Sequence, residues 1–158
     1  MVPKKAKNDQ GSTQHASQIS DMPLRACIAF LLLCSAHAMP IDEIRALDEK
    51  FGKLYNSADY DGVQAMYHPD ATLIPPTADA FIPQSGLADF FKQSASMGIK
   101  NVNLVPLQVT EEADGLTRHE IGNCTHSLQP NGGRYYVRWA KYNAGEWRLM
   151  LDIMAIGE

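Results

Sequence analysis

The C-terminal stretch 116–156 constrains the fold more than any other part of the chain, because it reads as three strands in succession. Its segments LTRHEIGNCTHSLQ, RYYVRWAKY and EWRLMLDIMAI are joined by the turn-forming sequences PNGG and NAG. β-branched and aromatic residues crowd the segments, whereas Gly and Asn, which favour tight turns, lie between them. The stretch predicts an antiparallel meander, which needs helices from elsewhere in the chain to cover one face.

The segment 42–56 predicts the longest helix. Asp42 is placed to act as its N-cap, because a carboxylate there accepts hydrogen bonds from free backbone amides of the first turn. Apolar residues recur at spacings of three and four, which leaves Asp48 and its charged neighbours for water. The apolar face is formed by Ile44, Leu47, Phe51, Leu54 and Tyr55.

Two shorter helices are predicted next, separated by a strand and a loop at 77–84. Asp59 is expected to cap the first of these helices, and Ser85 the second. Gly98 ends the second, since glycine tolerates the left-handed conformation found at helix C-termini.

Strands are predicted at 71–74 and 101–110, upstream of the meander. Pro106 cannot donate a backbone hydrogen bond and therefore indicates an edge strand or a bulge. Asp114-Gly115 predicts a tight turn into the meander. Helices gathered mostly before an antiparallel sheet are typical of an α+β fold.

The N-terminal part carries a basic residue, an apolar run at 26–33 and the small-x-small sequence AHA. This order is typical of a secretory signal peptide, and the apolar run is shorter than the roughly 20 residues that span a bilayer. We therefore expect a signal peptide at 22–38 and a secreted, extracellular domain at 39–158, with its N-terminus at or near Met39.

Residues 1–21 are polar and show no apolar period. They predict either a disordered extension or a reading frame that begins before the true initiator, Met22. If Met1 is the start, the apolar run lies deeper than in most signal peptides, and a single-pass anchor is the alternative.

The charge of the domain argues against some partners. The leader holds four of the 14 Lys and Arg residues and two of the 18 Asp and Glu residues, so the remaining 120 residues carry a net charge of −6. This acidic balance argues against a nucleic acid or an anionic membrane as partner. Only Cys124 of the three cysteines lies beyond the leader, so the domain forms no internal disulfide.

The sequences FGKLYNSADYDGVQAMYHPDATLIPP, SGLADFF and RYYVRWAKYNAGEWRLMLDI resemble the NTF2-like superfamily, most closely its SnoaL-like and DUF4440 group. The resemblance covers nearly all of 42–156. It implies an NTF2-like (cystatin-like) cone, in which three N-terminal helices pack on a curved, mostly antiparallel sheet and a pocket lies at the open end. It also implies a homodimer, since dimers are common in the family.

Ketosteroid isomerase, an enzyme of this superfamily, uses a carboxylate base, a Tyr and a protonated Asp. By alignment these roles fall on Pro75, Phe51 and Arg138, none of which can perform them. The resemblance therefore does not support steroid-isomerase chemistry.

Asp152 lies between Met150 and Met154 in the last predicted strand, where a carboxylate must be paired or line a cavity. SnoaL-like cyclases resemble this arrangement, because they use acidic pocket residues as acid/base groups. Arg138 faces Asp152 if the hairpin has a three-residue loop at 144–146, which we favour. A two-residue loop puts them on opposite faces. The pair is a candidate catalytic site or a structural ion pair.

The predicted pocket around Asp152 is apolar and suits a small hydrophobic ligand. Its predicted lining is Leu54, Tyr55, Met66, Phe90, Phe91, Tyr136, Met150 and Met154.

The spacing of His68, His119 and His126 matches no common zinc motif. The sequence has no nucleophile elbow, phosphate-binding loop or Cys-His pair either. We therefore expect no metal and no cofactor.

Asn123-Cys124-Thr125 is an N-glycosylation sequon. A modified Asn123 must face solvent, and alternation along a strand then turns Cys124 inward.

The last predicted strand is apolar on both faces, with Leu149, Leu151 and Ile153 on one and Met150 and Met154 on the other. One face covers the first helix, so the other favours burial against a second copy of the chain.

Three functions remain open from the sequence. The first is binding of a small hydrophobic ligand without turnover. The second is acid/base catalysis of the SnoaL-like cyclase or isomerase type, with Asp152 as the reacting group. The third is a non-catalytic dimeric interaction module.

Overall fold

The computed structural model describes residues 39–76, 81–143 and 145–154. They belong to the second of the two units into which the chain divides, 38–158. The predicted signal peptide and the extension before it lie outside the described residues, as do positions 155–156 at the end of the last predicted strand. No helix within the described ranges is long and apolar enough to cross a membrane.

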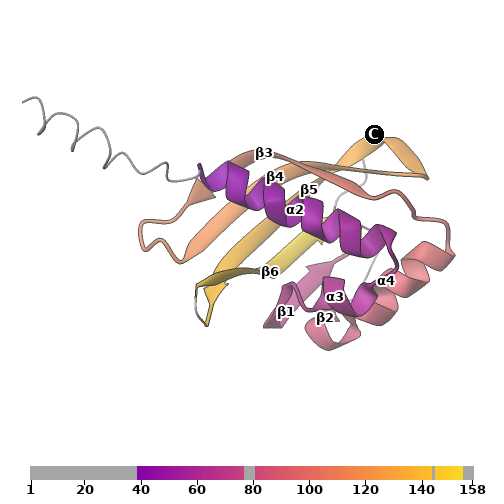
Figure 1. Cartoon of the computed structure of the whole chain (residues 1–158), viewed down its shortest axis with the longest axis horizontal. Coiled ribbons are helices and arrows are strands. Elements are labelled where there is room, and N and C mark those ends of the chain that lie inside the picture. The colour runs from indigo at the N-terminus through magenta and orange to yellow at the C-terminus, as the bar shows by residue number, and fades with distance from the viewer. Residues whose placement is uncertain (1–38, 77–80, 144, 155–158) are drawn as a thin grey trace, which may run out of the picture. The chain divides into compact units, whose positions relative to one another are not determined.

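One sheet forms the base of the domain. Its strands are β1 Tyr67–Ile74, β2 Ile82–Pro83, β3 Asn103–Glu111, β4 Thr117–His126, β5 Gln129–Tyr142 and β6 Glu146–Met154. Their order across the six-stranded sheet is β2-β1-β6-β5-β4-β3 (Figure 1). Strands β4 to β6 form the predicted antiparallel meander, β3 pairs with β4 antiparallel, and β1 pairs with β6 in parallel. The sheet is therefore mostly antiparallel.

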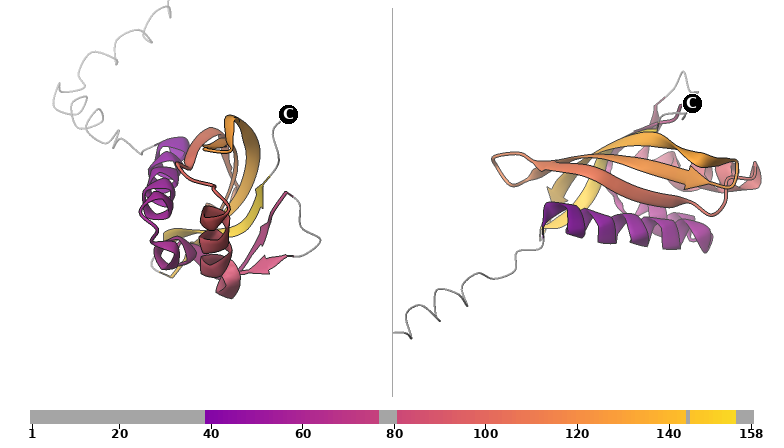
Figure 2. Two further views of the ribbon diagram at one scale, coloured as in Figure 1. Left: turned by 90° about the vertical axis from the view of Figure 1, so that its right-hand side faces the viewer. Right: turned by 90° about the horizontal axis from the view of Figure 1, so that it is seen from above.

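The helices are α2 Pro40–Asn56, α3 Tyr60–Gln64 and α4 Leu87–Ser96, and a 3₁₀ turn, η1 Gln84–Gly86, leads into α4. Only α2 is long, with 17 residues, whereas α3 has 5 and α4 has 10. The prediction of three N-terminal helices on the sheet is therefore confirmed only in part, because two of the helices are short and α4 follows β1 and β2. Figure 2 shows α2 running along one face of the sheet, which bends over it.

Helix α2 begins at Pro40, so the prediction of Asp42 as its N-cap is wrong. Met39 occupies the N-cap position without a side-chain hydrogen bond. Pro40 explains the earlier start, because its ring fixes a helical φ and it has no N–H to leave unpaired. Asp42 lies instead in the first turn, where the helix dipole favours a carboxylate.

The two short helices begin differently from each other. Asp59 caps α3 as predicted, accepting a hydrogen bond from Gly62 N at 2.9 Å. Ser85 does not cap α4, because the η1 turn places Gly86 in that position. Gly98 has the predicted left-handed conformation after α4, with φ of 101°.

Strand β3 is an edge strand, and its register with β4 shifts between Pro106 and Gln108. Both predictions made from Pro106 are confirmed. The predicted loop 77–84 contains a short strand, β2, which pairs with β1.

The turn between β4 and β5 comes earlier than predicted. Only two residues separate His126 from its partner Gln129, so the PNGG sequence lies within β5. Gly132 has φ of 84°, and the register shifts between Cys124 and His126. The glycine-rich sequence therefore makes a bulge rather than the turn.

The hairpin register that pairs Arg138 with Asp152 is wrong. Tyr142 pairs with Glu146, so the predicted loop at 144–146 is one residue too late. An extra residue in β6, Met150, then shifts the register again, so that Arg138 is opposite Leu151 and Val137 is opposite Asp152. Side chains alternate along a strand, and Val137 and Asp152 are buried while Arg138 is exposed. The predicted ion pair does not form.

The same bulge changes the predicted faces of β6. Leu149, Asp152 and Met154 lie on the inner face, and Leu151 and Ile153 lie on the outer face. The predicted grouping of Leu149 with Leu151 and Ile153 is therefore wrong, because strict alternation fails where one residue is inserted.

Four aromatic side chains join the helices to β1. Phe91 of α4 contacts Phe51 and Tyr55 of α2 edge-on, with ring centroids 5.6 and 5.9 Å apart. Tyr67 of β1 lies 6.2 Å from Phe91 and 6.5 Å from Phe51. This cluster orients one end of α2 over the sheet, because such edge contacts are favourable and specific in geometry.

Asn56 ties the end of α2 to the chain before β3. Its Nδ2 donates to Val102 O and its Oδ1 accepts from Val102 N, each at 2.9 Å. We expect Asn56→Ala to lower the free energy of unfolding by about 1–3 kcal/mol, because it leaves both backbone groups of buried Val102 without these partners.

Chemical denaturation measures this change. Lys53→Ala, an exposed substitution on the same helix, is the control and should change the free energy of unfolding by no more than about 0.5 kcal/mol. If Asn56→Ala lowers the free energy of unfolding no more than the control does, the two Asn56 hydrogen bonds do not stabilise the domain.

Candidate functional site

A cavity of about 150 Å³ lies between the helices and the inner face of the sheet. Most of its wall is apolar, and α2, α4 and the strands β3 to β6 all contribute to it. The apolar and aromatic lining includes Phe51, Tyr55, Phe90, Phe91, Val102, Leu104, Val137, Trp139, Leu149 and Met154. The carboxyl groups of Asp48 and Asp152 are part of the same wall.

The structure brings together part of the predicted pocket. Asp152 lines the cavity with Tyr55, Phe90, Phe91 and Met154.

The remaining predicted pocket residues lie elsewhere. Met66 is buried in the core at the end of α3, and Leu54 packs partly buried against that core. Tyr136 is on the outer face of β5, and Met150 is the inserted residue of the bulge. The cavity wall therefore does not include these four.

Asp152 is almost fully buried, with 4% of its surface exposed. The Tyr67 hydroxyl donates a hydrogen bond to Asp152 Oδ2 at 2.6 Å. Burial raises the pKa of Asp152 to about 7, because an ionised carboxylate is poorly solvated there. The bond from Tyr67 opposes this rise in the pKa, and the nearby charge of Glu120 adds to it.

Asp48 is also buried, at 2% exposed, so the prediction that it faces water is wrong. It lies four residues after Ile44 and three before Phe51, on the stripe of α2 that faces the sheet. Helical spacing alone could have indicated its burial. We expected exposure instead, because a charged residue on a helix usually faces water.

Tyr135 joins two buried carboxyl groups. Its hydroxyl lies 3.0 Å from Asp48 Oδ2 and 2.6 Å from Glu120 Oε1. On the other side of Glu120, Trp139 Nε1 donates to Oε2 at 2.7 Å. Sequence reasoning missed this network, because Glu120 and Tyr135 look like ordinary strand residues until their partners are known.

The hydrogen bonds of this network locate a proton. A phenol has one proton and can donate to only one carboxyl, so the other carboxyl must carry a proton and donate to the phenol oxygen. Glu120 already accepts the Trp139 donor as well, so we assign the added proton to Asp48. Burial, and next the charge of Glu120, raise the pKa of Asp48 to about 9, in agreement with this assignment.

Gly122 makes room for the tyrosine. A Cβ atom at this position would lie 2.2 Å from Cζ and the hydroxyl oxygen of Tyr135. The ring therefore occupies the space that any other residue at 122 would need. The missing side chain of β4 positions the phenol between the two carboxyl groups.

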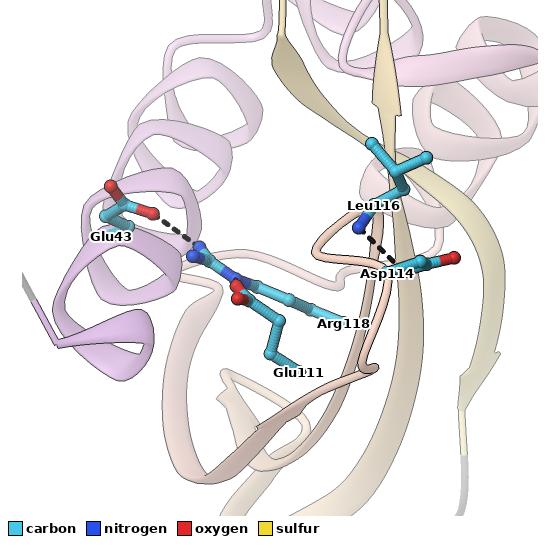
Figure 3. Close-up of polar contacts among 5 residues, drawn as sticks. All are labelled: Glu43, Glu111, Asp114, Leu116 and Arg118. Carbon is cyan, nitrogen blue, oxygen red and sulfur yellow. Dashed lines mark hydrogen bonds and ion pairs between the residues drawn. The ribbon is translucent and has the colours of Figure 1, made fainter.

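The buried arginine of the described residues serves a different part of the domain. Arg118 pairs with Glu43 at the start of α2 and with Glu111 of β3 (Figure 3). Its guanidinium also lies 4.2 Å from the ring centre of Trp147. Figure 3 shows the predicted Asp114-Gly115 turn nearby, where Leu116 N donates to Asp114 Oδ1 at 2.8 Å.

The three histidines considered above as metal ligands lie apart from one another. His119 is on the outer face of β4, where it bonds Tyr136 and Glu112, and His126 lines the cavity. His68 is at the start of β1 beside Asp70. Within the described ranges, no three His, Cys, Asp or Glu side chains are grouped so as to hold a metal ion.

The sequon lies on β4 with the predicted orientation. Asn123 accepts a hydrogen bond from Arg134 on the outer side, and Cys124 lines the cavity. Burial raises the pKa of the Cys124 thiol to about 11, so it stays protonated at neutral pH.

The chain has the NTF2-like, or cystatin-like, α+β fold, as comparison with solved structures shows, and this confirms the predicted fold class. A cystatin-like domain of unknown function from Nostoc punctiforme matches with a TM-score of 0.61 and 14% identity, over 74% of this chain and 76% of that one. An NTF2-like protein of unknown function from Pseudomonas putida matches with a TM-score of 0.56 and 18% identity, over 74% and 86%.

A third structure, an NTF2-like protein of unknown function from Shewanella oneidensis, has a TM-score of 0.59 and 15% identity, over 75% of this chain and 100% of that one. At such identities the likeness shows the fold alone. No protein-family profile and no curated protein matches the sequence.

The raised pKa of Asp48 predicts a pH dependence of stability. The folded domain holds a proton up to about pH 9 that the unfolded chain releases above the ordinary value of 3.8. Folding takes up protons in that window, so the free energy of unfolding falls as the pH rises through it. Asp48→Asn keeps a neutral group there and should flatten the decline, by up to about 1.4 kcal/mol per pH unit.

Denaturant titrations at several pH values measure the slope. Glu49→Gln, at the exposed neighbouring position on α2, should leave the slope as it is in the unmodified protein. Equal slopes for Asp48→Asn and Glu49→Gln would refute a proton on Asp48.

Proposed function

We propose that the domain binds a small, largely apolar molecule in the cavity between α2, α4 and the sheet. The observation that carries this proposal is the composition of the cavity wall. The wall is mostly apolar, and its few polar groups include the carboxyls of Asp48 and Asp152. Concave sites of this composition, with a small number of placed polar groups, are typical of small-molecule pockets. A volume of about 150 Å³ supports a ligand near the size of one ring, since an apolar cavity of about that volume admits benzene.

Filling the cavity tests the proposal. Cys124→Phe introduces a ring at the cavity wall of β4, and Ile121→Phe adds the same ring to the exposed, outer face of that strand. We expect the unmodified domain to bind one-ring probes such as toluene, phenol and benzyl alcohol. Cys124→Phe should weaken that binding at least about tenfold, because the ring takes the ligand's space.

Titration calorimetry and melting shifts measure the binding, and circular dichroism checks that each variant is folded. Ile121→Phe should bind as the unmodified domain does. Equal affinity in the two variants would place the binding outside the cavity, and a failure of every probe to bind would contradict the proposal.

A second candidate function is acid/base catalysis on a ligand in the same cavity. It is favoured by two cavity carboxyls whose pKa values differ, about 7 for Asp152 and about 9 for Asp48. Near neutral pH Asp152 is available as a base and Asp48 as an acid, and such separated pairs are typical of acid/base sites. These groups differ from those that ketosteroid isomerase uses, and Asp152 acts without the predicted help of Arg138.

Proton exchange tests this candidate. With a one-ring ketone such as cyclohexanone in deuterated buffer, the base removes a proton beside the carbonyl and returns a deuteron, with no net reaction. We expect the domain to speed this exchange, and Asp152→Asn to slow it by about a hundredfold, as loss of a general base does. Nuclear magnetic resonance follows the label, and Arg138→Gln on the outer face is the matched control. Exchange that is as fast in Asp152→Asn as in the control would exclude the role.

We further propose that the domain is a secreted member of the SnoaL-like and DUF4440 group and forms a homodimer. The leader sequence at 22–38 supports secretion. Apolar side chains on the outer face of the sheet, Ile121, Leu151 and Ile153, support a second copy as the partner.

A further inference from the structure

The cavity offers a hydrogen-bond acceptor, and the hydroxyl and indole donors around that acceptor are used within the domain. The Tyr55 hydroxyl donates to Ile99 O at 3.1 Å, and the Ser94 hydroxyl donates to Phe90 O at 2.9 Å. The phenol of Tyr135 and the indole of Trp139 are held by Glu120. The hydroxyl of Tyr67 is held by Asp152.

Asp152 keeps one oxygen for a ligand. Tyr67 takes Oδ2, and no described residue forms a hydrogen bond with Oδ1. No fully buried side-chain nitrogen or oxygen of the described residues is without a partner, so Oδ1 has its access from the cavity that Asp152 lines. An acceptor in this position favours a ligand that brings a donor.

The buried carboxyl groups of the site favour a ligand that carries a positive charge. Asp48, Glu120 and Asp152 are all buried, and none of the ion pairs among the described residues involves them. Buried carboxyl groups without a cation are costly to ionise. A positively charged group entering the cavity would offset that cost for the group that it contacts.

Other titratable groups around the cavity do not supply this charge. Arg134 of β5 is exposed and donates to Asn123, and His126 of β4 accepts from Leu128 N through Nδ1. The groups that act on Asp152 are Tyr67 and Glu120. The titratable residues at the cavity besides Asp152 are Asp48, Tyr55, Cys124, His126, Arg134 and Tyr135, and of these Arg134 turns its side chain to the outer side.

We infer that the ligand is a small primary or secondary amine with an apolar, one-ring body, and that its ammonium group donates to Asp152 Oδ1. This inference rests on the proposed ligand-binding function of the cavity. The ring of the ligand packs against the aromatic wall formed by Phe51 and Phe91, and the ammonium supplies the missing positive charge.

A pair of probes with the same body tests the inference. Benzylamine carries the ammonium group, and benzyl alcohol replaces it with a neutral hydroxyl. At about pH 8 we expect benzylamine to bind the full domain at least about tenfold more tightly, because hydrogen bonds to charged groups are stronger than neutral ones. Asp152→Asn should remove that preference, and Arg138→Gln on the outer face should keep it.

The pH dependence gives a second readout. An aliphatic ammonium group stays protonated below about pH 10, whereas Asp152 ionises near its raised pKa of about 7. The affinity for benzylamine should therefore rise between about pH 5.5 and about pH 8, and that for benzyl alcohol should not. Tyr67→Phe removes a bond that lowers the pKa of Asp152, so it should shift the rise to higher pH, which keeps the test decisive if Asp152→Asn does not fold.

The outcomes separate the two proposals. Equal affinity for both probes, unchanged in Asp152→Asn, would overturn the amine inference and retain the pocket. A preference for benzylamine that survives in Asp152→Asn, with a rise that Tyr67→Phe does not shift, would overturn the assignment to Asp152. Failure of both probes, and of the neutral one-ring probes, would overturn the proposed function itself.

Discussion

Three buried carboxyl groups, those of Asp48, Glu120 and Asp152, lie in one apolar interior. The packing of the domain depends on the protons and hydrogen bonds that compensate for burying them. Tyr135 has one phenol proton for two of them, so Asp48 keeps a proton, while Glu120 accepts hydrogen bonds from the phenol and from Trp139. Asp152 is held separately, by a single phenol from β1. Each carboxyl comes from a different element, so the network of Asp48, Glu120 and Tyr135 can form only when α2, β4 and β5 have all packed together.

Helix α2 can carry a buried acid because both of its ends are fixed by polar contacts. Glu43 in its first turns pairs with Arg118 of the sheet, and Asn56 at its last residue holds the backbone of Val102. Between these two ends the helix has little freedom to rotate. Asp48 therefore stays on the side that faces the sheet, where it bonds the Tyr135 hydroxyl, although a carboxyl without such a partner would favour the solvent side.

The elements of the fold could be predicted because they depend on patterns that the sequence carries locally. Alternation and turn residues located the meander, and helical spacing located α2. The site depends on exceptions to those patterns. Met150 is one inserted residue that reverses the faces of β6, and no local signal separates it from its neighbours. Asp48 did carry a local signal, because its helical spacing from Ile44 and Phe51 indicates burial. Its charge indicates exposure to solvent instead, and the two signals conflict.

Gly122 has a consequence beyond the space that it leaves. A methyl group there would overlap the phenol of Tyr135, so the two positions cannot vary independently. A side chain at 122 is therefore compatible only with a smaller residue than tyrosine at 135, and without that phenol Asp48 loses its hydrogen-bond partner in the interior.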